Sequence, residues 1–162
     1  MVCGEQVELD VFCQRARSFF ERGMPREAIE LYSDVIRVSA EYAPAYAGRG
    51  TVYALLRLFD SALQDVIKAN QIYPAESDYA CTAGTLFIEL KNLDKAFEYF
   101  EKAISTKPDH LLAFYNRATA YHKIGRIEKA MEDLERCLDI NEDDEMAKAI
   151  RYRMTVVSPA RR

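Results

Sequence analysis

The sequence repeats itself every 34 residues, and this period limits the possible folds more than any other feature. Small, aromatic and alanine residues each recur four times at this step, without an insertion. The three sets are Ala16, Gly50, Gly84 and Ala118; Phe19, Tyr53, Phe87 and Tyr121; and Ala28, Ala62, Ala96 and Ala130. A fixed period of about 20–50 residues is typical of repeat proteins, in which each unit is one supersecondary element stacked on the next.

Each unit has the pattern of two helices. Tyr46, Gly50 and Tyr53 are separated by four and three residues, which is the spacing of one helical face. Gly23 lies between the two helices expected in the first unit, and Pro74 follows the second helix of the second unit; both residue types favour helix ends. The pattern predicts helices over residues 8–22, 25–39, 43–57, 59–73, 77–90, 93–106, 111–124, 127–140 and 144–155.

With these residues in place, the chain resembles a tetratricopeptide repeat (TPR) protein. The family pattern is an aromatic residue, then Leu-Gly and Tyr, later Ala and Phe, and finally Pro. The best matching units carry Tyr46, Gly50, Tyr53, Ala62, Ala69 and Pro74, and then Gly84, Phe87, Ala96, Phe100, Ala103 and Pro108. The departures are Arg15, Arg49 and Arg117 where Leu is usual, and Ala40 and Glu142 where Pro is usual.

The resemblance implies an all-α fold, a right-handed α-solenoid of four helix pairs with a C-terminal capping helix. The expected division of the chain is a lead-in over 1–8, repeats over 9–42, 43–76, 77–110 and 111–144, a capping helix over 145–157 and a loose basic tail over 158–162. A terminal helix packs on one side only, so it needs a polar outer face. Lys148, Arg151 and Arg153 are expected to supply that face.

Composition and charge exclude several classes of function. The formal net charge is −4, and the basic residues gather only near the end of the chain, so nucleic acid is not expected as a partner. The longest stretch without a charged side chain is ten residues, so we expect no membrane insertion. Four widely separated cysteines indicate neither a disulfide framework nor a zinc site and fit a reducing compartment. We therefore expect a cytoplasmic protein with no cofactor and no metal.

The resemblance also implies that the first helix of each pair lines the concave side of the solenoid. Apart from the recurring small and aromatic positions that form the core, these helices carry a mixed set of small, apolar, hydroxyl and amide side chains. Such a surface suits an extended segment or a docked helix. We expect the peptide-binding groove to include Gln14, Arg17, Thr51, Leu55, Thr82, Thr85, Ile88, Tyr115, Asn116, Thr119, His122 and Lys123. Asp10, Cys13, Ala47, Gly48 and Asp78 lie on the same helices.

Two binding modes known in the family are not matched by these positions. Chaperone-binding TPR proteins hold a terminal carboxylate with a clamp of lysine, arginine and asparagine. The corresponding residues here are Cys13, Arg17, Gly48, Asp78 and Thr82, which do not assemble the required cations. The O-linked N-acetylglucosamine transferase superhelix uses a ladder of asparagines, of which only Asn116 is present.

Catalysis is not expected. His122 with Cys81 one repeat earlier is the one arrangement that resembles a nucleophile and its base, and adjacent helices would hold the two too far apart for direct contact. We therefore predict a non-catalytic protein–protein interaction module (an adaptor, scaffold or chaperone-like protein) for a partner of unknown identity. The alternative is a structural homo-oligomer assembled through the repeat ends or the groove, and a secretion-type chaperone is a minor alternative.

Overall fold

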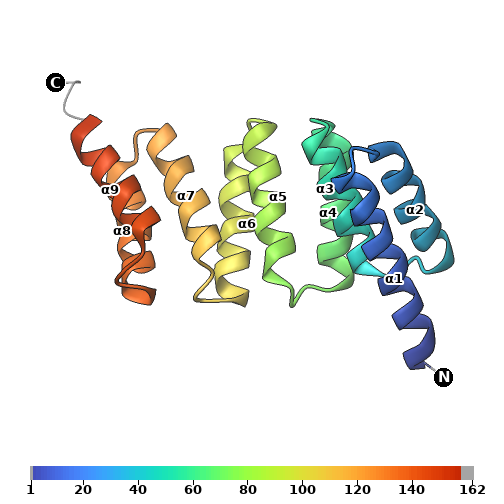
Figure 1. The fold of residues 1–162 in the computed structure, drawn as a ribbon. Coiled ribbons are helices and arrows are strands. Elements are labelled where there is room, and N and C mark those ends of the chain that lie inside the picture. Colours follow the sequence, from blue (N-terminus) through green and yellow to red (C-terminus); the bar gives the residue numbers. More distant parts are fainter. Residues whose placement is uncertain (1, 158–162) are drawn as a thin grey trace.

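The computed structural model describes the backbone of residues 2–157 and the side chains of residues 7–155. Within these residues the chain forms nine α-helices and no strand (Figure 1). The helices are α1 (Val2–Glu21), α2 (Pro25–Val38), α3 (Ala43–Leu55), α4 (Phe59–Ile72), α5 (Ser77–Glu89), α6 (Leu93–Thr106), α7 (Leu111–Lys123), α8 (Ile127–Ile140) and α9 (Glu145–Val157).

The helices form an all-α solenoid. Consecutive helices pack as the antiparallel pairs α1–α2, α3–α4, α5–α6 and α7–α8, and each pair contacts the next through its second helix. The pairs stand side by side from one end of the molecule to the other, and α9 closes the stack against α8 (Figure 1). Among the first helices, α1 also contacts α3 and α5 contacts α7.

The first helix is longer than the sequence pattern predicts. It starts at Val2, so the segment 2–8 that was expected to be a lead-in is helical, and its first turns project beyond the neighbouring helix (Figure 1). This stretch contains no proline and a single glycine, so nothing in it ends the helix. The predicted tail over 158–162 lies outside the described residues.

The small-residue columns lie where the two helices of a pair cross. Ala28, Ala62, Ala96 and Ala130 are all completely buried. A methyl group added to Gly50 would lie 2.9 Å from Val66 Cγ2. One added to Gly84 would lie 2.7 Å from the ring of Phe100, and real methyl groups do not approach that closely. Only small side chains fit at these recurring positions, because the backbones of the two paired helices lie close together there.

The turn between the two helices of each pair uses the left-handed backbone conformation at the same register position. Gly23 and Gly125 have φ of +77°, while Arg57 and Lys91 occupy the equivalent positions with φ of +61° and +59°. This conformation brings the Cβ of an L-residue too close to the following carbonyl oxygen, whereas glycine adopts it freely. The second and third repeats therefore carry strained turns that the first and fourth do not.

Replacing Arg57 or Lys91 by glycine is expected to raise the free energy of unfolding by about 1 kcal/mol each, because the strain of the left-handed conformation is removed. Urea unfolding followed by circular dichroism measures the change. Gly125→Ala is the matched control: open space surrounds the position, so the expected loss of stability comes from the backbone alone. If these three variants were as stable as the natural protein, the left-handed φ would have no effect on the stability of these turns.

Two buried ion pairs replace apolar contacts inside alternate repeats. The Arg49 guanidinium donates from Nε and Nη2 to the two oxygens of Asp65, at 2.7 and 2.8 Å. Arg117 donates to Asp133 in the same way, at 2.9 and 2.7 Å. Each aspartate follows its arginine by 16 residues. The arginines that depart from the family pattern at 49 and 117 are therefore partners of a buried carboxylate in the same helix pair.

The third repeat has no such pair, because Ala83 and Tyr99 occupy the two positions. In the first repeat, Arg15 is exposed and the second position is Leu31. The second and fourth repeats therefore carry the ion pair, and the first and third do not.

Candidate functional site

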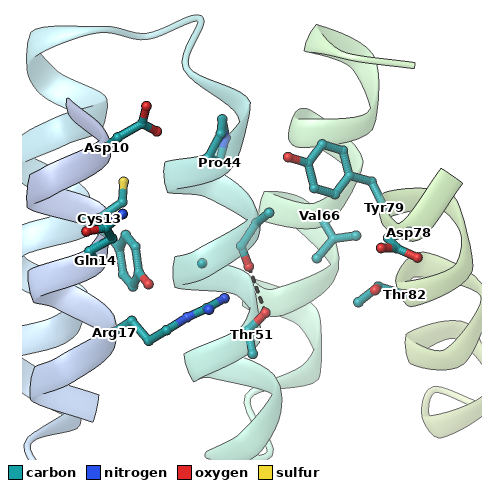
Figure 2. A pocket seen from close by; sticks show the side chains of 13 residues that line it. Asp10, Cys13, Gln14, Arg17, Pro44, Thr51, Val66, Asp78, Tyr79 and Thr82 are labelled. Carbon is teal, nitrogen blue, oxygen red and sulfur yellow. Dashed lines mark hydrogen bonds between the residues drawn. The ribbon is translucent and has the colours of Figure 1, made fainter. Parts of the chain in front are cut away.

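A hollow with a volume of about 480 Å³ lies between the first helices α1, α3 and α5, on the side of the solenoid where the sequence predicts the groove. We call it the groove hollow. Most of its side chains come from these three first helices, and Tyr32 of α2 and Val66 of α4 form its floor. Figure 2 shows Arg17 extending from α1 toward Thr51 of α3, with Thr82 of α5 beyond it. The lining consists of Asp10, Cys13, Gln14, Arg17, Tyr32, Pro44, Ala47, Gly48, Thr51, Val66, Asp78, Tyr79 and Thr82.

Glycine at position 48 shapes the floor of the hollow. A methyl group there would lie 2.5 Å from the ring of Tyr32, so the ring could not reach its place against α3. Burial raises the pKa of Tyr32 above its ordinary value, so the phenol is neutral at physiological pH. A neutral phenol can both donate and accept a hydrogen bond.

Acidic side chains at one edge of the hollow are joined to the loops that end the first and third repeats. The Tyr42 hydroxyl donates to Asp10 Oδ1, and burial together with this bond raises the pKa of Tyr42. His110 Nε2 lies 2.9 Å from Asp78 Oδ1, and the imidazole is buried while the aspartate side chain is 72% exposed. The partners are 32 residues apart in both cases, so the two contacts are equivalent in the repeat register.

A hydrogen-bonded cluster links α5 to α7 farther along the concave side. Asn116 Nδ2 donates to Thr85 Oγ1 at 3.0 Å and lies 3.8 Å from Cys81 Sγ. Burial raises the pKa of the Cys81 thiol to about 11, so the thiol is protonated at physiological pH. A protonated, buried thiol is a poor nucleophile, which argues against the pairing with His122 that the sequence raised.

The structure places the twelve predicted groove residues in different surroundings. Gln14, Arg17, Thr51 and Thr82 line the groove hollow. Thr85 and Asn116 are bonded to each other, while Leu55, Thr119 and Lys123 are exposed and His122 is half-buried. The remaining two face the core. Ile88 packs against buried residues of the third repeat, and Tyr115 is buried with its hydroxyl donating to Asp144.

Four lining residues were absent from the sequence prediction: Tyr32, Pro44, Val66 and Tyr79. Tyr32 and Val66 come from second helices, whereas the sequence prediction places only first helices on this side. A signal for Tyr32 was present in the sequence, because a glycine in a helix interior, such as Gly48, often marks the close approach of another group.

The hollow offers hydrogen-bond donors and acceptors rather than a reaction centre. Gln14 and Thr82 can each donate and accept, Thr51 can accept while its own hydroxyl donates to the Ala47 carbonyl, and Arg17 adds a cation. Among the side chains that the structure describes, no three histidine, cysteine or acidic residues are grouped as metal ligands. None of the helices over residues 2–157 combines the length and apolar content that a bilayer crossing requires.

Solved structures with the same fold are TPR proteins. The crystal structure of MamA superposes with a TM-score of 0.77 at 22% sequence identity, covering 85% of this chain and 81% of MamA. The first TPR of Spaghetti (RPAP3), solved with the HSP90 peptide SRMEEVD bound, superposes with a TM-score of 0.65 at 18% identity. That match covers 70% of this chain and 90% of the RPAP3 chain.

Sequence relatives are much longer than this chain. The BBSome complex member BBS4 of Bos taurus is 28% identical over 121 residues, which are 75% of this chain and 23% of BBS4. The protein O-mannosyl-transferase TMTC1 of Homo sapiens is 27% identical over 130 residues, which are 78% of this chain and 15% of TMTC1. The chain thus spans less than a quarter of either relative.

Two family models, both described as tetratricopeptide repeat, match this chain side by side. One covers residues 13–77 and the other residues 84–155, so together they span the helix pairs and most of α9. Sequence pattern, helix arrangement and family match agree, and the chain belongs to the tetratricopeptide repeat family.

Proposed function

We propose that this chain is a non-catalytic protein–protein interaction module, acting as an adaptor, scaffold or chaperone-like protein, that binds a peptide or helix segment of its partner in the concave groove. The observation that carries the proposal is the groove hollow between α1, α3 and α5, lined by amide, hydroxyl and guanidinium groups over a floor of Tyr32 and Val66. Solenoid proteins commonly use such concave surfaces to bind other proteins.

The chemistry of the lining favours an internal segment of the partner over its C-terminal carboxylate. An extended segment presents a backbone donor and an acceptor at each residue, and Gln14 and Thr82 can pair with both. Arg17 is the single cation among the residues that line the hollow, while Asp10 and Asp78 stand at its edge. A terminal carboxylate would meet two negative charges and one positive charge there.

The bound HSP90 peptide in the RPAP3 structure supports peptide binding by a TPR array of this size.

The Arg17→Glu variant is expected to bind partner peptides at least about tenfold more weakly, because a charge-assisted hydrogen bond is lost and a repulsive charge enters the hollow. Peptides selected from a random display library on the natural protein supply the ligands, and fluorescence anisotropy gives Kd. Arg37→Glu is the matched control, since Arg37 is 76% exposed on α2, outside the residues that line the hollow. Equal affinity of the Arg17→Glu variant, with helicity intact, would place binding on another face.

A homo-oligomer is the second candidate, favoured by the apolar surface at the N-terminal end of the stack. Val7, Val11 and Val38 are 60%, 56% and 79% exposed there, beside a hollow of about 620 Å³ that Phe12 helps to line. Light scattering on the purified chain separates this candidate from a monomeric binding module. The cytoplasmic location and the secretion-type chaperone role stay predictions from the sequence.

A further inference from the structure

A second pocket opens at the edge of the groove, where the loops after α2 and α4 meet the start of α3 and α5. We call it the rim pocket. Its volume is about 400 Å³, and it is lined by Glu41, Tyr42, Ala43, Pro44, Ile72, Tyr73, Glu76 and Tyr79. Pro44 and Tyr79 also line the groove hollow, so the two sites adjoin. Figure 2 shows the Tyr79 side chain projecting from α5 toward Pro44 of α3.

Three tyrosines give the rim pocket aromatic walls. Tyr73 is 54% exposed, Tyr79 is half-buried, and Tyr42 is buried and held by its bond to Asp10. Burial, and then the nearby carboxylates of Glu76 and Asp78, raise the pKa of Tyr79. Tyr42 and Tyr79 are therefore neutral at physiological pH, and the negative faces of aromatic rings attract cations.

The charged groups of the rim pocket are all acidic. Glu76 is half-buried, and one of its oxygens accepts a long contact of 3.5 Å from the backbone N–H of Asp78. Glu41 is exposed and lies 3.3 Å from Lys68, which is not among the lining residues. The eight lining side chains thus combine two carboxylates and three aromatic rings without a cation.

Tyr73 and Tyr79 are not required for stacking the repeats. The positions equivalent to Tyr73 in the other repeats hold Ser39, Lys107 and Asn141. The positions equivalent to Tyr79 hold Val11, Ala45 and Ala113, and both of these alanines are fully buried between helix pairs. A small residue therefore suffices for packing there, and the tyrosines form a pocket at one junction of the array.

We propose that the rim pocket binds an arginine side chain of the segment that occupies the groove. A planar guanidinium can stack on tyrosine rings and, at the same time, donate from its edge to a carboxylate such as that of Glu76. A lysine ammonium cannot make both contacts with the same geometry. This inference rests on the proposed function, because the arginine belongs to a peptide already held in the groove hollow.

The experiment selects peptides from a random display library on the natural protein and on the Tyr73→Ala and Glu76→Gln variants. Peptides selected on the natural protein are expected to carry arginine at one fixed position, and this preference should disappear on either variant. Replacing that arginine by citrulline, which has the same shape without the charge, should weaken binding to the natural protein about tenfold. On the Tyr73→Ala variant the same replacement should change Kd by less than twofold.

Tyr152→Ala and Glu142→Gln are matched controls, because both residues are exposed and lie outside the rim pocket. The arginine preference should survive in both. Selected peptides without an arginine preference, a preference for lysine, or citrulline peptides that bind equally well would overturn the rim-pocket proposal while leaving groove binding intact. A library that yields no binder at all would overturn the proposed function and this inference with it.

Discussion

Arg117→Ala is expected to lower the free energy of unfolding by about 3–5 kcal/mol, because it leaves the buried carboxylate of Asp133 without its partner. Asp133 is 4% exposed, and both of its oxygens accept hydrogen bonds from Arg117. Urea unfolding at pH 7, followed by circular dichroism, measures the loss. A loss below about 1 kcal/mol would mean that water or another cation replaces the guanidinium at this site.

The double variant Arg117→Ala with Asp133→Tyr is the control, because it copies the Ala83 and Tyr99 pair of the third repeat. It should recover most of the lost stability, since apolar residues of suitable volume often replace a buried ion pair without cost. A double variant as unstable as Arg117→Ala would show that the arginine acts through some other contact.

The effect of Arg117→Ala should also depend on pH. Burial raises the pKa of Asp133, and Arg117 opposes that shift, so removing the arginine raises the pKa of the carboxyl further. An acid whose pKa is raised in the folded state binds its proton more readily there, so stability falls as pH rises through the interval above 3.8. The difference in free energy of unfolding between the variant and the natural protein should therefore become smaller as pH is lowered from 7 toward 4.

Phe100→Ala is expected to cost about 3–5 kcal/mol of unfolding free energy, because the side chain is fully buried and its removal leaves a cavity in the middle of the stack. Its ring lies directly against Gly84, which has no side chain to fill the space. Thermal unfolding by circular dichroism tests the expectation. A loss of stability as small as that caused by substituting an exposed residue would show that the third repeat closes the cavity at little cost in free energy.

A second pair of variants tests whether glycine and phenylalanine are matched to each other. Gly84→Ala alone should cost about 1–3 kcal/mol through overpacking against the Phe100 ring. Gly84→Ala with Phe100→Leu copies Ala118 and Leu134 of the fourth repeat. This double variant should therefore lose less stability than the sum of its two single changes, and simple additivity would contradict the match.

The helices and their pairing could be predicted because the repeat places equivalent residues in equivalent contacts. Four fully buried alanines at a 34-residue step report the helix crossings directly. The ion pairs were not predicted, because Arg49 and Arg117 stand where the family pattern has leucine and therefore look like departures. Aspartate 16 residues later in the same two repeats was the available signal. The sequence alone does not show that a spacing of 16 residues joins two side chains across a helix crossing.

The groove could be predicted only in part, since the repeat register locates a residue on a helix and does not locate its side chain among its neighbours. Gln14, Arg17, Thr51 and Thr82 line the groove hollow because their neighbours on α3 are small. Tyr115 occupies a similar helical face but turns inward, where its hydroxyl donates a hydrogen bond to Asp144 after α8. That contact joins residues 29 apart, which no local pattern connects.

Ion pairs join the two helices of the second and fourth repeats, while the third repeat between them has none. This order bears on how the molecule unfolds, because removing an arginine leaves its buried carboxylate unpaired inside a single helix pair. Amide hydrogen exchange should accordingly accelerate first in α3–α4 of an Arg49→Ala variant and first in α7–α8 of the Arg117→Ala variant, so that the chain opens in separate segments rather than from one end.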